Sequence, residues 1–115
     1  MVISNAIVCD VNGERELDVR IENGVVTELG KALSDEKIID AQGAYLLPSL
    51  IDTNVRLQDA SLNAKNIKDI HDEALRGGVG HIVLNADSQP AIDNEVVLEF
   101  AQNGIKNLDG VKIDL

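Results

Sequence analysis

Three residues in this sequence carry side chains suited to nucleophilic or metal chemistry: Cys9, His71 and His81. A cysteine nucleophile needs a base within hydrogen-bond reach, and a metal site needs several ligands brought together. Cys9 falls inside an expected N-terminal β-unit, so no Cys-His or Ser-His-Asp arrangement can be argued. His71 shares a predicted helix face with Ile67 and Leu75, which favours a partly buried packing residue. His81 stands near the start of a predicted strand, away from the carboxyl end where α/β sites form. The three residues therefore predict neither a catalytic group nor a metal ligand.

Two further patterns with a chemical interpretation also predict ordinary structure. The glycine-rich run at 77–80 lies between a predicted helix and a predicted strand. A phosphate-binding loop has the opposite order, because it follows a strand and opens a helix. The twenty acidic residues are spread over turns and helix faces, as on a solvated surface.

Composition narrows the class of protein. The chain has 115 residues, and its ten Lys and Arg against twenty Asp and Glu give a net charge of −10. We therefore expect no nucleic-acid partner and no membrane partner, since binding either polyanion needs clustered cations. A single cysteine forms no intramolecular disulfide, and there is neither a signal peptide nor an apolar run of about 18 residues, so a cytoplasmic protein is expected. The length suits one ordinary domain and falls well short of the roughly 250 residues of a complete (β/α)8 barrel.

The first part of the chain, residues 1–47, reads as short strands joined by turns. Apolar and charged residues alternate over 17–22, which is the period of a half-buried strand. Asn-Gly pairs at 12–13 and 23–24 are typical of two-residue hairpin turns. We predict a small antiparallel β-unit over residues 1–47.

From Pro48 onward the pattern changes to alternating strands and helices. A buried strand is expected at 49–55 and a helix at 63–76, followed by a strand at 79–84. A second helix should begin at Asp93 or Asn94 and end at Gly104, and a third strand should begin at 111. This order, β-α-β-α-β over 48–115, favours parallel strands with right-handed crossovers. From the pattern alone, the segment is either the opening of a larger sheet or barrel or a complete three-stranded α/β domain.

Five local motifs, taken in order, resemble the amidohydrolase superfamily and within it the dihydroorotases. They are IENGVV at 21–26, IDAQG at 39–43, LPSLID at 47–52, ALRGGV at 74–79 and QPAIDN at 89–94. The resemblance covers essentially the whole chain. It implies an α/β protein in which the β-unit is part of a β-sandwich. The residues after it would then form the first βαβαβ segment of an incomplete TIM-like (β/α)8 barrel.

The resemblance also places the family's zinc-binding His-x-His pair at the end of the first barrel strand. The matching residues here are Asn54 and Arg56. A neutral imidazole offers a lone pair to a metal, whereas arginine is a permanent cation with none. No zinc or other cofactor is therefore expected, and both residues are treated as degenerate family positions.

The substrate-binding positions implied by the family have changed as well. An arginine and an asparagine that would hold a substrate carboxylate correspond here to Gln58 and Asp87. Gln58 lacks the charged fork of arginine, and Asp87 places a negative group where an anion should lie. Ser49 also replaces the glycine that follows the proline in the family motif. We expect the 115-residue chain to be inactive.

Two hypotheses of function follow from the resemblance. The first is a non-catalytic dihydroorotase-like protein of pyrimidine biosynthesis that acts as a structural partner of aspartate transcarbamoylase; a homo-oligomer is left open. The alternative is part of an active metal-dependent amidohydrolase that hydrolyses a cyclic amide with ligands beyond residue 115. A weaker third possibility is a free-standing module whose α/β half makes an unknown contact.

Overall fold

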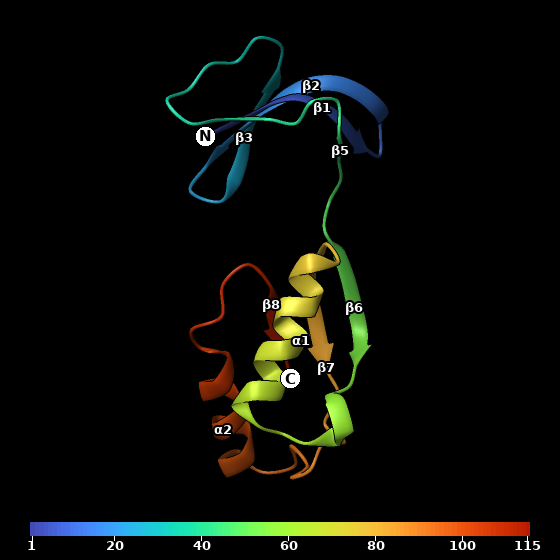
Figure 1. Cartoon of the computed structure of the whole chain (residues 1–115), viewed down its shortest axis with the longest axis vertical. Helices are drawn as coiled ribbons and strands as arrows, with labels where there is room; N and C mark the ends of the chain where they lie inside the picture. The colour runs from blue at the N-terminus through green and yellow to red at the C-terminus, as the bar shows by residue number, and fades with distance from the viewer. The chain divides into compact units, whose positions relative to one another are not determined.

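The computed structural model describes all residues, 1–115. The chain forms two compact units, Met1–Pro48 and Ser49–Leu115, which we call the N-terminal unit and the C-terminal unit (Figure 1). Length alone favoured a single domain, but the change of pattern at Pro48 coincides with the boundary between the units. No helix in the structure combines the length and the apolar character needed to cross a membrane.

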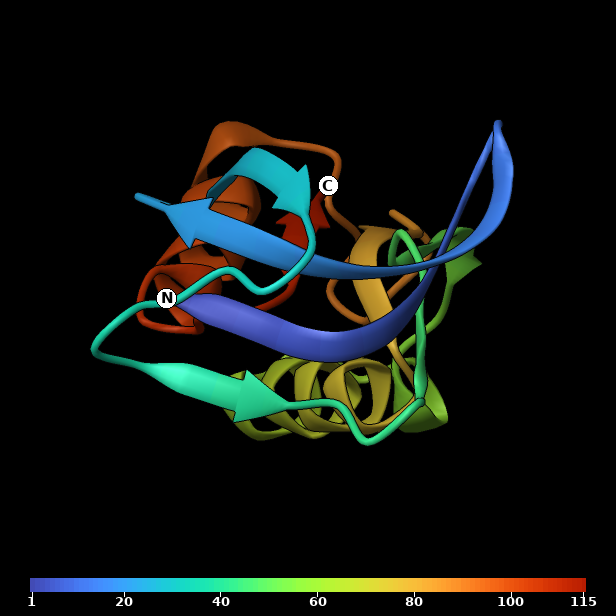
Figure 2. The same cartoon turned by 90° about the horizontal axis from the view of Figure 1, so that it is seen from above.

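The N-terminal unit is one five-stranded sheet. Its strands are β1 (Val2–Asp10), β2 (Gly13–Glu22), β3 (Val25–Gly30), β4 (Ile38–Asp40) and β5 (Tyr45–Leu46). The sheet order is β3-β2-β1-β4, with β5 also paired to β1, and Figure 2 shows β2 between β3 and β1. Strands β1, β2 and β3 form the predicted antiparallel meander. Strands β4 and β5 instead pair with β1 in parallel, because the chain crosses to the far side of β1 after β3.

One hairpin turn and one buried carboxylate fix the shape of this sheet. Asn23 and Gly24 have φ values of 51° and 77°, the positive angles that the two-residue turn between β2 and β3 requires. Asp18 is buried in β2, where its two carboxylate oxygens accept the backbone N–H groups of Asn5 and Leu33. The apolar core beside it is built on Ala6, Val8 and Val19.

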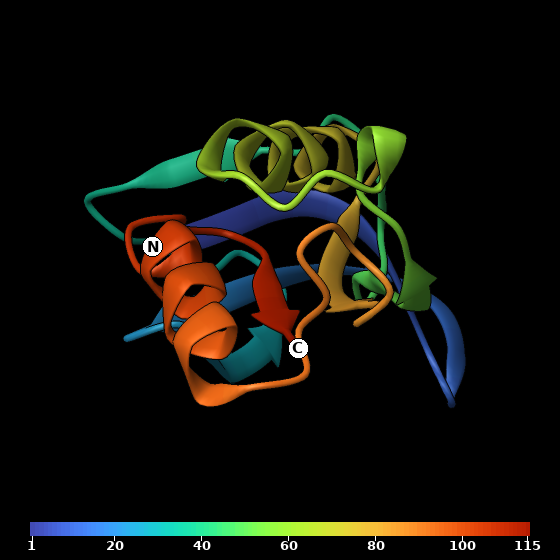
Figure 3. The ribbon, with the colours of Figure 1, turned by 90° about the horizontal axis from the view of Figure 1, so that it is seen from below.

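The C-terminal unit is a parallel sheet with two helices (Figure 3). Its elements are β6 (Leu50–Val55), the short 3-10 helix η1 (Gln58–Ala60), α1 (Ala64–Arg76), β7 (Val79–Leu84), α2 (Glu95–Ile105) and β8 (Lys112–Asp114). The sheet order is β6-β7-β8, and every pair is parallel. The mixed α/β fold expected from the sequence is confirmed, with helices joining successive parallel strands.

Capping residues set where both helices begin. The side chain of Asn63 accepts the N–H of Asn66, and the side chain of Asn94 accepts the N–H of Val97. Each bond satisfies one of the free N–H groups in a first helical turn. The sequence left two candidates for the cap of the second helix, Asp93 and Asn94, and the structure shows that it is Asn94. The helix α2 runs one residue past Gly104, to Ile105.

The core of the C-terminal unit lies between the helices and the sheet. Its buried members are Leu57, Leu62, Ile67, Leu84 and Ala101. The predicted strand at 49–55 is present, but the expectation that it is buried is wrong, since Leu50 and Ile51 are 63% and 64% exposed. The reason is that β6 lies at the edge of this sheet and pairs only with β7.

A close approach between β6 and β7 accounts for one departure from the family motif. The hydroxyl of Ser49 fills the space beside Gly80, so a Cβ atom at position 80 would stand 2.3 Å from Ser49 Oγ. Ser49 and Gly80 are therefore a matched pair. A side chain at one of these positions is accommodated because the other position has none.

Candidate functional site

The candidate site lies where β6 and β7 end, at the carboxyl edge of the parallel sheet. Ligands of α/β proteins bind at this edge. Asn54 and Arg56 lie at the end of β6, while Asn85 and Asp87 follow β7. The N–H of Asn85 donates to the carbonyl oxygen of Val55 at 2.8 Å, which keeps the two strand ends adjacent. We call these four polar residues, 54, 56, 85 and 87, the strand-end ladder.

The ladder consists of two side-chain pairs, one on each side of Val55. Asn85 Nδ2 donates to Asn54 Oδ1 at 2.8 Å, and Arg56 Nη2 lies 3.3 Å from Asp87 Oδ2. Positions 54 and 56 thus face positions 85 and 87 with the same spacing of two residues. Two of the substituted family positions, Arg56 and Asp87, form an ion pair with each other.

The chemistry of these donors does not fit a zinc ion. The guanidinium of Arg56 has no lone pair, and its charge is already compensated by Asp87. The amide oxygen of Asn54 is engaged by Asn85. Asp52, two residues earlier on β6, accepts the backbone N–H of Asn54 at 3.0 Å and so closes the strand end. No three His, Cys, Asp or Glu residues anywhere in the chain lie close enough to hold a metal together.

Gln58 lies apart from the ladder's bonds, against the helix α1. Its backbone carbonyl accepts Asn66 Nδ2 at 3.1 Å. With Arg56 it lines a shallow pocket whose other walls include Asp69 and Glu73. Asp69 and Glu73 give this pocket two carboxylates against the single cation of Arg56, which disfavours an anionic ligand.

The two histidines both have partners within the chain. His71 is buried, with Nδ1 2.9 Å from Asp72 Oδ1 and Nε2 2.9 Å from the carbonyl oxygen of Asp109. These bonds give it a packing role between α1 and the loop before β8. The Asp72 carboxylate also receives a bond from Lys68, and the two bonds together, Lys68 first, lower the pKa of Asp72.

His81 belongs to a pair that the sequence did not indicate. Its Nε2 lies 2.8 Å from Asp114 Oδ2, which also bonds Lys112 Nζ at 2.7 Å. Both bonds, that from Lys112 first, lower the pKa of Asp114. The contact depends on the register of β7 with β8, in which His81 lies opposite Lys112. Asn85 was missed for the same reason, although the equal spacing of 54/56 and 85/87 is a signal that could have indicated it.

Comparisons with known proteins agree with this geometry at the level of fold and family. No family model matches the chain. A dihydroorotase of Trichlorobacter lovleyi is 38% identical over 94 residues, which cover 78% of this chain and 22% of that protein. A dihydroorotase of Caldanaerobacter subterraneus subsp. tengcongensis is 33% identical over 106 residues, covering 89% of this chain and 25% of the relative. The chain therefore spans about a quarter of the length of these curated relatives.

Solved structures give the same picture. The L-hydantoinase (dihydropyrimidinase) of Arthrobacter aurescens superposes with a TM-score of 0.71 at 19% identity, over 87% of this chain and 24% of that one. A D-hydantoinase crystal structure gives 0.71 at 20% identity, over 97% and 25%. The fold is thus that of part of a hydantoinase-type amidohydrolase. Together with the sequence relatives, this fold confirms the family resemblance that the five motifs indicated. The chain is a dihydroorotase-like member of the amidohydrolase superfamily and matches the N-terminal portion of such a protein.

Proposed function

We propose that this chain belongs to a non-catalytic dihydroorotase-like protein, which serves pyrimidine biosynthesis through protein contacts and not through hydrolysis. The observation that carries the proposal is the strand-end ladder. Arg56 occupies a position where the family binds metal, and Asp87 balances its charge within the chain. Both side chains are more than half exposed, so this is a surface ion pair that adds little stability but leaves a cation at the family's metal position. The two strand ends are joined by the Asn54–Asn85 hydrogen bond and the Arg56–Asp87 ion pair.

The proposed partner is aspartate transcarbamoylase. Two points support this partner: the family resemblance, and a site whose donors do not fit zinc. A family member that lacks the metal ligands can still act through its protein-binding surfaces. The chain has a net charge of −10, so a contact with a basic surface of the partner is expected to weaken at high salt.

A zinc-binding experiment tests the non-catalytic part of the proposal. The chain, incubated with zinc and desalted, is expected to retain less than about a tenth of an equivalent, because the ladder offers no free ligand pair. The double substitution Asn54→His and Arg56→His should raise the retained zinc toward about one equivalent, because it supplies two imidazoles and frees the Asp87 carboxylate as a third ligand. Elemental analysis measures both.

The matched control is Asn54→Ala with Arg56→Ala, which removes the cation without adding ligands and should stay empty. Stoichiometric zinc in the unaltered chain, together with turnover of dihydroorotate, would show that the protein is a metal-dependent hydrolase and would end the proposal.

A co-elution experiment tests the partner. The chain and the aspartate transcarbamoylase of the same organism, mixed at about 10 µM, are expected to elute together in size-exclusion chromatography, as a specific micromolar or tighter complex would. Separate elution at that concentration contradicts the partnership while leaving the zinc result untouched.

A further inference from the structure

The helix α2 carries an apolar groove on its outer flank. The groove is lined by Leu62, Pro90, Val96, Val97 and Phe100. Val96 and Phe100 are 77% and 50% exposed, although both are large and apolar. They stand four residues apart, on one face of the helix. Phe100 is the only phenylalanine of the chain, and its exposure is therefore a distinctive feature of this surface.

The groove lies on a defined side of α2. The inner side is marked by Ala101, which is fully buried in the core. The flank with Leu98 and Gln102 borders the C-terminal residue Leu115. At 100° per residue, Val96 and Leu98 point about 200° apart, so the groove lies on the opposite flank from Leu115.

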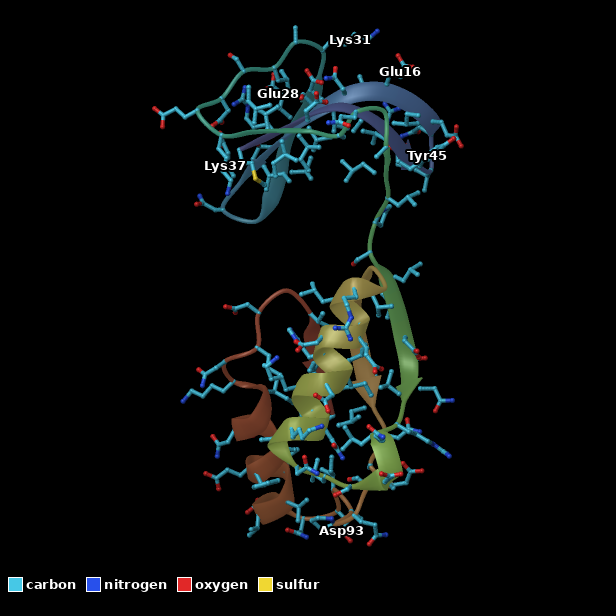
Figure 4. All side chains as sticks on the ribbon, in the orientation of Figure 1. Glu16, Glu28, Lys31, Lys37, Tyr45 and Asp93 are labelled. Carbon is cyan, nitrogen blue, oxygen red and sulfur yellow. The ribbon has the colours of Figure 1, made fainter.

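Three acidic residues stand close to the groove's lining residues in the sequence. Asp93, Glu95 and Glu99 are exposed, and Glu95 and Glu99 directly precede Val96 and Phe100. Figure 4 shows Asp93 at the end of the unit where α2 begins. None of the three acids forms an ion pair in the structure, and residues 77–105 contain no Lys or Arg. The groove therefore has an apolar floor beside these three uncompensated acids, which we call the acidic rim.

From this geometry we infer that the α2 groove binds a basic amphipathic helix of a partner protein. The apolar face of such a helix covers Val96 and Phe100, and its flanking Lys or Arg side chains reach the acidic rim. A second copy of this chain is disfavoured, because it would bring two negative rims together. Nucleic acid and anionic lipid are disfavoured for the same reason. The inference stands on these residues alone and does not rest on the proposed function.

Binding of a defined peptide tests the inference. The probe is a fluorescein-labelled amphipathic peptide of about 18 residues built from Leu, Ala and Lys, with a scrambled peptide of the same composition as its control. The unaltered chain should bind the amphipathic peptide, as followed by fluorescence anisotropy, and bind the scrambled one at least about tenfold more weakly. Phe100→Ala and the double reversal Glu95→Lys with Glu99→Lys should each weaken binding about tenfold.

A matched charge reversal separates the groove from the overall charge. Glu16→Lys with Glu36→Lys changes the net charge equally but lies in the N-terminal unit, where both residues are exposed (Glu16 is labelled in Figure 4). This variant should bind as the unaltered chain does. Circular dichroism confirms that each variant is folded.

Three outcomes would overturn the inference. One is the absence of binding at about 100 µM peptide, because a dissociation constant above this value is too weak for a specific complex. Another is equal weakening by the two charge reversals, which would mean that only overall charge attracts the peptide. The last is self-association of the chain that Phe100→Ala abolishes, which would assign the groove to a second copy.

Discussion

Substituting alanine for Ile67 is expected to lower the free energy of unfolding of the C-terminal unit by about 2–5 kcal/mol, the usual loss for a large buried aliphatic side chain. Ile67 lies in the first turn of α1 and is fully buried. Its Cδ1 atom lies 2.9 Å from where a Cβ at Gly104 would stand, so Ile67 fills the contact between α1 and α2. The site can collapse little around the cavity, because Leu84 and Ala101 in the same core are themselves buried.

The same core holds the strand-end ladder in position. Val55 and Leu84 are the last residues of β6 and β7, and both belong to the core around Ile67. Asn54 and Asn85 are their immediate neighbours in the chain. A cavity at Ile67 should therefore loosen the ladder as well as the helices, which connects the packing of α1 to the geometry of the site.

Denaturant unfolding followed by helical circular dichroism measures this effect, since α1 and α2 are the only α-helices and both belong to the C-terminal unit. Ile51→Ala is the matched control: it removes the same atoms from a side chain that is 64% exposed. Its cost should stay within about 1 kcal/mol, the range of strand propensities. Similar losses for the two variants would contradict the view that Ile67 anchors the core.

Local patterns in the sequence predict the elements of this fold but not all of their pairings. The strand at 79–84 follows from a short apolar run, and the start of α2 follows from a capping side chain, Asn94; both signals act within a few residues. The parallel pairing of β4 and β5 with β1 depends on where a crossing segment places them. The exposure of β6 depends on which strands lie beside it. Neither can be derived from a short stretch of sequence.

In the candidate site, too, the sequence predicted the residues but not their contacts. The sequence identified Asn54, Arg56 and Asp87 through a family resemblance, taking each position singly. Their pairing depends on register, and β6 has an irregularity between Asp52 and Val55 that shifts its register with β7. The ion pair between Arg56 and Asp87 is therefore a property of the folded strands. The α2 groove is similar, because the exposure of Val96 and Phe100 depends on how the helix is rotated on the sheet.

In the N-terminal unit, Asp18→Ala is expected to reduce the free energy of unfolding by about 1–3 kcal/mol, because it removes a buried carboxylate that accepts two backbone N–H groups. Asp18 is 8% exposed, and its carboxylate accepts the N–H of Asn5 at 2.9 Å and that of Leu33 at 3.0 Å. Asn5 has a φ of 54° and lies at the irregularity in the pairing of β1 with β2. Leu33 follows Ala32, whose φ is 55°. One side chain thus holds two strained stretches of backbone together.

Asp40→Ala provides the matched comparison, because Asp40 also accepts two bonds, from Asn5 Nδ2 and from the N–H of Gln42, both at 2.9 Å. Asp40 is exposed, so water can replace its carboxylate and the loss should be clearly smaller. Amide hydrogen exchange of β1 and β2 reports on this unit separately from the helices. Asp18→Asn should fall between Asp18→Ala and the unaltered chain, because its one remaining carbonyl oxygen can accept only one of the two N–H groups well. If Asp18→Ala and Asp40→Ala accelerated exchange equally, burial would not increase the stabilisation that Asp18 provides. Its two hydrogen bonds would then contribute no more than those of an exposed carboxylate.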